Sequence, residues 1–198
     1  LIGPGDVQWM TSGRGILHEE MPRRDSKGRV DGFQLWVNLP KARKMVPPRY
    51  QEIDTVNIPE IASSGINVRV IAGEVGGIKG PVTEIAAHPF YVDLTLEASA
   101  SFMQFIPADH TVIAYVFDGS CRFGTEGDMV HSVSLAVLEK GDHIEVYSDK
   151  GGRLMLMSGA PFGEPIMPYG PFVMNTQEEI RQALKDLREG TFVDPPPV

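Results

Sequence analysis

The sequence has few of the features that mark secreted, membrane-spanning or nucleic-acid-binding proteins. It contains one cysteine, Cys121, so no disulfide can form within the chain and a reducing, cytoplasmic environment is expected. The net charge of −8 argues against direct binding to nucleic acid or to an anionic membrane surface, because both need a basic protein face. No apolar run approaches the roughly 20 residues that a membrane helix requires.

Glycine and proline are plentiful, with 21 and 16 of the 198 residues, and they favour turns between short strands. Segment 31–40 alternates strictly between apolar and other side chains, as a half-buried strand does. Its predicted inner face holds Phe33, Leu35, Val37 and Leu39. Further short apolar runs with the spacing of a sandwich or barrel lie at 66–73, 90–96, 111–117, 133–138 and 153–158. Residues 41–60 are polar, contain three prolines and are interpreted as a linker.

One helix is predicted close to the end of the chain, at about 176–189. Thr176 and Glu179 have the spacing of a capping box, in which each side chain bonds to the backbone amide of the other residue. A single apolar stripe follows and Gly190 can end the helix. The stripe consists of Ile180, Ala183, Leu184 and Leu187.

A weak internal repeat relates the two halves of the chain. Residues 2–9 align without gaps on residues 138–145, an offset of 136 (138 − 2) that also places His18 on Leu154 and Glu20 on Leu156. Two copies of one β module would explain the match. In that case a polar pair in the first copy is replaced by an apolar pair in the second.

His18 and Glu20 are the sharpest candidates for chemistry. In a strand, residues two apart point to the same face, with Glu19 on the opposite side. An imidazole and a carboxylate on one strand form half of a mixed nitrogen–oxygen metal site. The alternative is a solvated strand end after a glycine-rich turn. The repeat favours the metal site, because the equivalent positions in the second copy are apolar. The first copy would then be the active module and the second an inactive one.

The other candidate residues indicate no reaction. None of the remaining histidines has ligand spacing from another His, Asp or Glu on a common face, so they are expected to be structural or merely exposed. They are His88, His110, His131 and His143. Cys121 has no partner that would mark a nucleophile. A Ser-His-Asp order, a P-loop and a dinucleotide fingerprint are absent from the sequence.

Three blocks together identify a family. Residues 3–22 (GPGDVQWMTSGRGILHEEMP), 34–40 (QLWVNLP) and 170–176 (GPFVMNT) resemble the pirin family, in the family's order. The resemblance implies an all-β protein of two cupin domains, each a double-stranded β-helix of jelly-roll type, with a C-terminal α-helix.

The chain starts with Leu1 and with what reads as the end of a strand, so we expect an N-terminally truncated pirin whose first cupin domain is incomplete. The expected division has four parts. Residues 1–47 form the end of the N-terminal metal-binding cupin, 48–60 a linker, 61–165 a C-terminal cupin without metal ligands, and 166–198 the helix and tail.

The resemblance also implies a mononuclear iron site held by three histidines and one glutamate. The matching residues here are His18 and Glu20, and two further histidines, from a His-x-His strand, are expected upstream of Leu1. The repeat gives Phe105 and Pro107 as their counterparts, so the second barrel should be apolar and free of metal. The expected ion is Fe(II), with other divalent transition metals possible.

Several pirins are similar to quercetinases, which open flavonols such as quercetin with O2 and release carbon monoxide. The implied function is a metal-dependent dioxygenase of this type, with Glu20 accepting the proton of the substrate hydroxyl and Met10 lining the pocket. One alternative is an iron-dependent transcription co-regulator that binds other proteins, which would add a nuclear location in a eukaryote. Another is an inactive cupin fragment, and the truncated chain alone is expected to be inactive.

Overall fold

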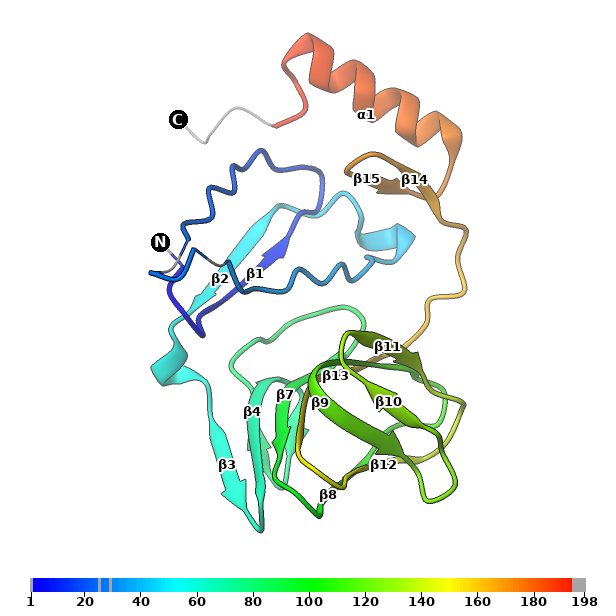
Figure 1. Cartoon of the computed structure of the whole chain (residues 1–198). Coiled ribbons are helices and arrows are strands. Elements are labelled where there is room, and N and C mark those ends of the chain that lie inside the picture. Colours follow the sequence, from blue (N-terminus) through cyan, green and yellow to red (C-terminus); the bar gives the residue numbers. More distant parts are fainter. Residues whose placement is uncertain (1, 25, 29, 194–198) are drawn as a thin grey trace. The chain divides into compact units, whose positions relative to one another are not determined.

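The computed structural model describes residues 2–24, 26–28 and 30–193, which are mostly β-structure with one α-helix (Figure 1). The chain divides into two compact units. The barrel unit comprises Leu1–Trp9 and Gln51–Phe162, and the helix unit comprises Met10–Tyr50 and Gly163–Val198. In the described part of the chain, no helix is long and apolar enough to cross a membrane.

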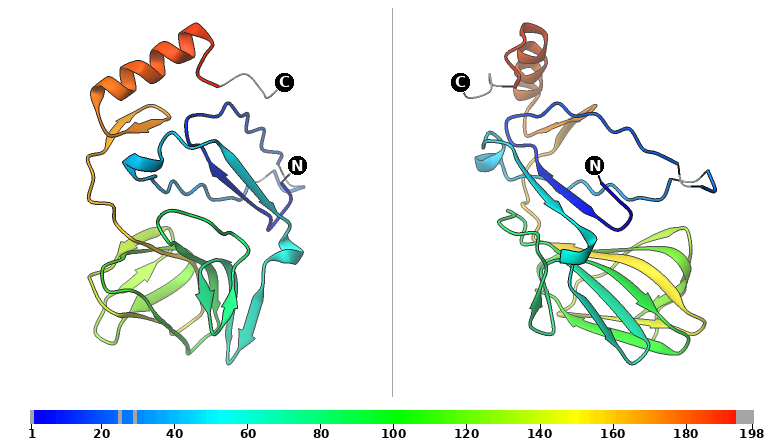
Figure 2. Two further views of the ribbon diagram at one scale, coloured as in Figure 1. Left: turned by 180° about the vertical axis from the view of Figure 1, so that it is seen from behind. Right: turned by 90° about the vertical axis from the view of Figure 1, so that its left-hand side faces the viewer.

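The barrel unit is built on a nine-stranded sheet that curls round on itself (Figure 2). Its main path runs through seven strands, and two short strands, β10 (Met129–His131) and β11 (Ser134–Val137), also pair with β9. In spatial order the path is β3 (Glu60–Ser63), β4 (Ile66–Ala72), β7 (Phe90–Leu96), β13 (Gly152–Gly159), β9 (Thr111–Phe123), β12 (His143–Ser148) and β8 (Ala100–Phe105). A separate hairpin joins β5 (Glu74–Val75) and β6 (Ile78–Lys79).

Strand β9 makes the curl possible because it is long enough to change neighbours. Residues 111–119 pair with β13, whereas residues 120–123 pair with β10 and β12. Alternate residues of β9 point inward, among them Val112, Ala114 and Val116, which are buried. The sequence prediction of an all-β cupin fold is confirmed.

The interior of this barrel is apolar. Leu154 and Leu156 are fully buried in the same core as Val116, as the repeat predicted. The prediction that Phe105 and Pro107 also point inward is wrong, because both are exposed. In β8 the inward residues are Ala100 and Phe102, so the period of two turns Phe105 outward and Ile106 enters the core after the strand ends.

The predicted strand at 31–40 does not form. Residues 30–40 contain no helix or strand, and Trp36 is 61% exposed. An alternating pattern specifies a strand only where a neighbour accepts its backbone hydrogen bonds, and no strand pairs with this segment within the described residues. The expected linker at 48–60 is more regular than predicted.

Two strands and two short turns flank this irregular segment. β1 (Val7–Thr11) pairs with β2 (Arg49–Ile53), and the 3-10 turns η1 (Lys41–Arg43) and η2 (Thr55–Asn57) lie on either side of β2. The linker therefore contains one strand and one turn. The division into four parts at residues 47, 60 and 165 stays a prediction.

The C-terminal helix is confirmed as α1 (Gln177–Glu189). Thr176 Oγ1 accepts a hydrogen bond from the Glu179 amide at 3.2 Å, and the Glu179 carboxylate accepts one from the Thr176 amide at 2.9 Å. Gly190 ends the helix in the left-handed conformation, with φ of 74°. Within the helix unit α1 contacts the hairpin of β14 (Met167–Tyr169) and β15 (Phe172–Met174), and Ile180 is the buried member of its stripe (Figure 1).

Candidate functional site

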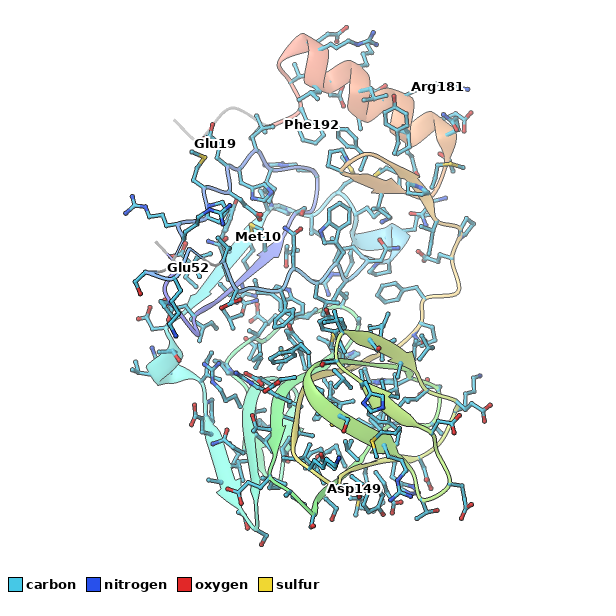
Figure 3. All side chains as sticks on the ribbon, viewed as in Figure 1. Met10, Glu19, Glu52, Asp149, Arg181 and Phe192 are labelled. Carbon is cyan, nitrogen blue, oxygen red and sulfur yellow. The ribbon has the colours of Figure 1, made fainter. Side chains whose placement is uncertain are left out.

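The two candidate ligands lie side by side in an irregular segment that follows β1. His18 Nδ1 is 3.8 Å from Glu20 Oε1, and the side chains are 37% and 60% exposed. Figure 3 labels Glu19, which separates them in the chain. The expected strand is not formed here, because residues 16–23 have no paired neighbour among the described residues. The pair nevertheless has the proximity that the sequence predicted.

Gln34 completes this cluster and was not predicted as a site residue. Its Nε2 donates a hydrogen bond of 2.9 Å to Glu20 Oε1, so the carboxylate is held on one of its two oxygens. The sequence did not indicate this contact. The predicted strand at 31–40 placed Gln34 on one face of the strand but gave it no partner. The contact joins two of the three blocks that resemble the pirin family.

The geometry of His18 and Glu20 fits two ligands of one metal ion. Ligands that each lie about 2.1 Å from a shared ion are at most about 4.2 Å apart, and the observed separation is 3.8 Å. Nitrogen and oxygen donors together suit Fe(II) and similar borderline ions. In the part of the chain that the structure describes, no group of three or more His, Cys, Asp or Glu side chains could hold a metal. The described residues thus supply two candidate metal-binding atoms at this position, one nitrogen and one oxygen.

Two glycines determine the backbone conformation just before the segment 16–23, which carries His18 and Glu20. Gly13 has φ of 53° and lies against the Val46 carbonyl, which accepts a hydrogen bond of 3.0 Å from the Arg14 amide. Gly15 has φ of 142°, and a Cβ atom there would lie 2.6 Å from the ring of Phe192. Only glycine suits this combination of conformation and close approach.

Phe192, labelled in Figure 3, belongs to the segment after α1 and was not predicted to matter. Its ring packs edge-on against Phe172, with centroids 5.5 Å apart. Met10, which the sequence predicted to line a pocket, lies on β1 and is half-buried. A pocket-lining role for Met10 stays a prediction.

The residues that the sequence set aside belong to the barrel unit and form no group of three or more possible metal ligands in the described part of the chain. His110 Nδ1 is 3.2 Å from Ser158 Oγ, and His88 and His131 are exposed. Cys121 lies in β9, and its side chain is fully buried. Burial raises the pKa of its thiol to about 11, which leaves it protonated and unreactive at neutral pH.

Comparison with known proteins gives the family. The model of the pirin C-terminal cupin domain matches residues 91–193, and the pirin model matches residues 1–37. A pirin-like protein of Caulobacter vibrioides is 41% identical over 194 residues, which cover 97% of this chain and 69% of that protein. Human pirin is 41% identical over 191 residues, covering 94% of this chain and 65% of its own length.

A solved structure supports the same assignment. The crystal structure of quercetin 2,3-dioxygenase from Acinetobacter baumannii superposes with a TM-score of 0.86 at 36% sequence identity. The match covers 96% of this chain and 68% of that one. Family models, sequence relatives and fold agree, and the chain belongs to the pirin family.

Proposed function

We propose that this chain carries part of the metal site of a flavonol-cleaving dioxygenase of the quercetinase type, with His18 and Glu20 as metal ligands. The observation that supports it is the 3.8 Å approach of His18 Nδ1 to Glu20 Oε1 in a chain that resembles a quercetin 2,3-dioxygenase along 96% of its length. Fe(II) is the proposed ion, and a small flavonol-like aromatic is the proposed substrate.

The proposal takes the remaining ligands from a His-x-His strand upstream of Leu1, as the family resemblance implies. The internal repeat supports an origin upstream of Leu1, although not the counterparts Phe105 and Pro107, which are exposed. Leu154 and Leu156, the counterparts of His18 and Glu20, lie on β13 between β7 and β9. The offset of 136 that relates the copies places the counterparts of β7 and β9 before Leu1.

Each residue of the cluster has a role in this proposal. The metal, when bound, supplies a Lewis acid that lowers the pKa of a flavonol hydroxyl. Gln34 holds Oε1 of Glu20 through its amide, which orients the carboxylate. Glu20 is the base that takes the hydroxyl proton, and its exposure leaves room for a substrate to approach. His18 supplies a nitrogen ligand beside the carboxylate.

The test uses the protein encoded by the complete reading frame that contains this chain. Metal content is measured by elemental analysis, and turnover by loss of quercetin together with release of carbon monoxide. We expect His18→Ala to abolish both. Glu20→Gln keeps the hydrogen-bonding shape but removes the base, so turnover should fall further than metal content does.

Glu19→Ala is the matched control, because Glu19 lies between the two ligands and should leave metal content and turnover unchanged. Undiminished metal in His18→Ala would overturn the site. Stoichiometric metal without quercetin consumption by the wild type would overturn the enzymatic function and favour the alternative, a metal-dependent regulator that binds other proteins.

A further inference from the structure

The outer face of β12 carries polar side chains that the proposed dioxygenase site does not use. His143, Glu145 and Tyr147 are two residues apart along the strand, so they project to the same side. The intervening residues, Ile144 and Val146, are buried in the barrel core. The side chain of His143 is 46% exposed and that of Glu145 is 32% exposed, so solvent reaches both.

Asp142 fixes the orientation of the His143 ring. Its Oδ1 lies 2.6 Å from His143 Nδ1, so a neutral imidazole carries its proton on Nδ1 and its lone pair on Nε2. The same hydrogen bond raises the pKa of His143 and lowers the pKa of Asp142. A carboxylate on the far ring nitrogen is the usual support of a metal-binding histidine.

The free ring nitrogen faces an oriented carboxylate. His143 Nε2 is 4.0 Å from Glu145 Oε1, while Glu145 Oε2 accepts a hydrogen bond of 3.1 Å from the Tyr147 hydroxyl. Two metal-binding atoms, His143 Nε2 and Glu145 Oε1, therefore face each other. Asp142 holds the imidazole through its other nitrogen, and Tyr147 holds the carboxylate through its other oxygen. Their separation is inside the limit of about 4.2 Å for two ligands of one ion.

The surrounding charges favour a cation. Asp142 and Glu145 contribute two negative charges, which outnumber the one positive charge of Arg122, whose guanidinium lies over the Tyr147 ring at 5.4 Å from its centre. The ring of Phe105 packs at a tilt against His143, with centroids 6.4 Å apart, and limits its rotation.

We propose that His143 Nε2 and Glu145 Oε1 form a second metal site, on the outside of the C-terminal cupin. The site would take a borderline divalent ion such as Cu²⁺ or Zn²⁺, which one imidazole and one carboxylate suit. Water completes the coordination, since no third His, Cys, Asp or Glu converges there among the described residues. The barrel interior stays apolar, because the pair lies on the opposite face of β12 from Ile144.

The test is paramagnetic broadening of amide NMR signals by substoichiometric Cu²⁺ on the full chain. We expect broadening at residues 142–147 that persists in His18→Ala, which separates this site from the dioxygenase site. His143→Gln should abolish it without loss of the folded spectrum, because the side chain is exposed. His131→Ala, at another exposed histidine, is the matched control and should leave the broadening unchanged.

Calorimetric titration with Zn²⁺ tests the role of the supporting carboxylate. Asp142→Ala should weaken binding at this site by about 10-fold, the lower end of the range for loss of such a partner. Broadening at 142–147 that survives His143→Gln, or that is absent from the wild type, would overturn the proposal. Unchanged affinity for Zn²⁺ in Asp142→Ala would overturn the positioning role of Asp142.

Discussion

The segment 16–23 and strand β13 are counterparts in the internal repeat, yet they have different structures. Leu154 and Leu156 are fully buried, and β13 is hydrogen-bonded on both sides, to β7 and to β9. His18 and Glu20 occupy the equivalent positions in an irregular, exposed segment. The difference teaches that a segment of this repeat forms a strand where neighbouring strands are present to pair with it. Intrinsic strand propensity alone does not determine whether it pairs.

The largest expected effect is on the free energy of unfolding. Leu156→Ala should lower it by about 2–5 kcal/mol, because it leaves a cavity in a closed core. Leu17→Ala, in the segment 16–23, should change it by less than about 0.5 kcal/mol, because Leu17 is 70% exposed. Urea unfolding of the two variants measures both values. Equal losses would show that the segment 16–23 is packed as β13 is.

The next effect compares two carboxylates. Asp93 on β7 is nearly buried and accepts two hydrogen bonds from Arg153, at 2.9 and 2.6 Å. Asp93→Ala should cost roughly 1–3 kcal/mol, because Arg153 then loses its partner but stays partly hydrated. Glu20→Ala removes an exposed carboxylate and should cost less than about 0.5 kcal/mol. Thermal unfolding at fixed pH compares them, and the reverse order would contradict the comparison.

A smaller effect is expected inside the helix unit. Gly15→Ala should destabilise the protein by about 1–2 kcal/mol, because its conformation is unfavourable for alanine and its new methyl group would meet Phe192. Gly32→Ala is the control, since a Cβ atom there meets no atom within 4 Å. Chemical denaturation followed by tryptophan fluorescence measures the free energy of unfolding of both variants. If Gly15→Ala behaved as Gly32→Ala does, the packing of Phe192 on Gly15 would be disproved.

The last expected effect appears only at alkaline pH, as a loss of stability in the barrel unit. Burial raises the pKa of Cys121 from 9.0 to about 11, so the folded state holds this proton more tightly than the unfolded state does. Its contribution is complete below pH 9.0 and should be lost as the pH rises to about 11. Cys121→Ala should remove this part of the decline when unfolding is measured across that range. Tyr91, whose pKa burial raises to about 12, acts in the same direction at still higher pH.

Local signals in the sequence were reliable. The capping box at Thr176 and Glu179 predicted the start of α1, because both hydrogen bonds join residues within one turn. The repeat aligns Val7 with His143, and these residues begin β1 and β12 in the structure. It also predicted the buried pair Leu154 and Leu156, since inward positions recur every second residue along a strand.

Features that depend on distant partners could not be predicted in this way. The alternating apolar pattern at 31–40 did not lead to a strand, because the pattern alone does not provide a neighbouring strand to pair with. Phe105 was assigned to the wrong face, since a weak repeat does not fix which of two adjacent residues points inward. The contacts of Gln34 with Glu20 and of Phe192 with Gly15 join segments that are separate in sequence, so only the structure brings them together.

The buried position of Cys121 has a practical consequence for spectroscopy. It is the single thiol of the chain and is sealed inside the barrel core, so it offers no competing background to a thiol-directed dye in the folded protein. A cysteine introduced at Asp149, an exposed turn position labelled in Figure 3, would be labelled alone. A second label near residue 20 would then turn the chain into a two-colour distance reporter, which tests whether the segment that carries His18 moves when metal is added.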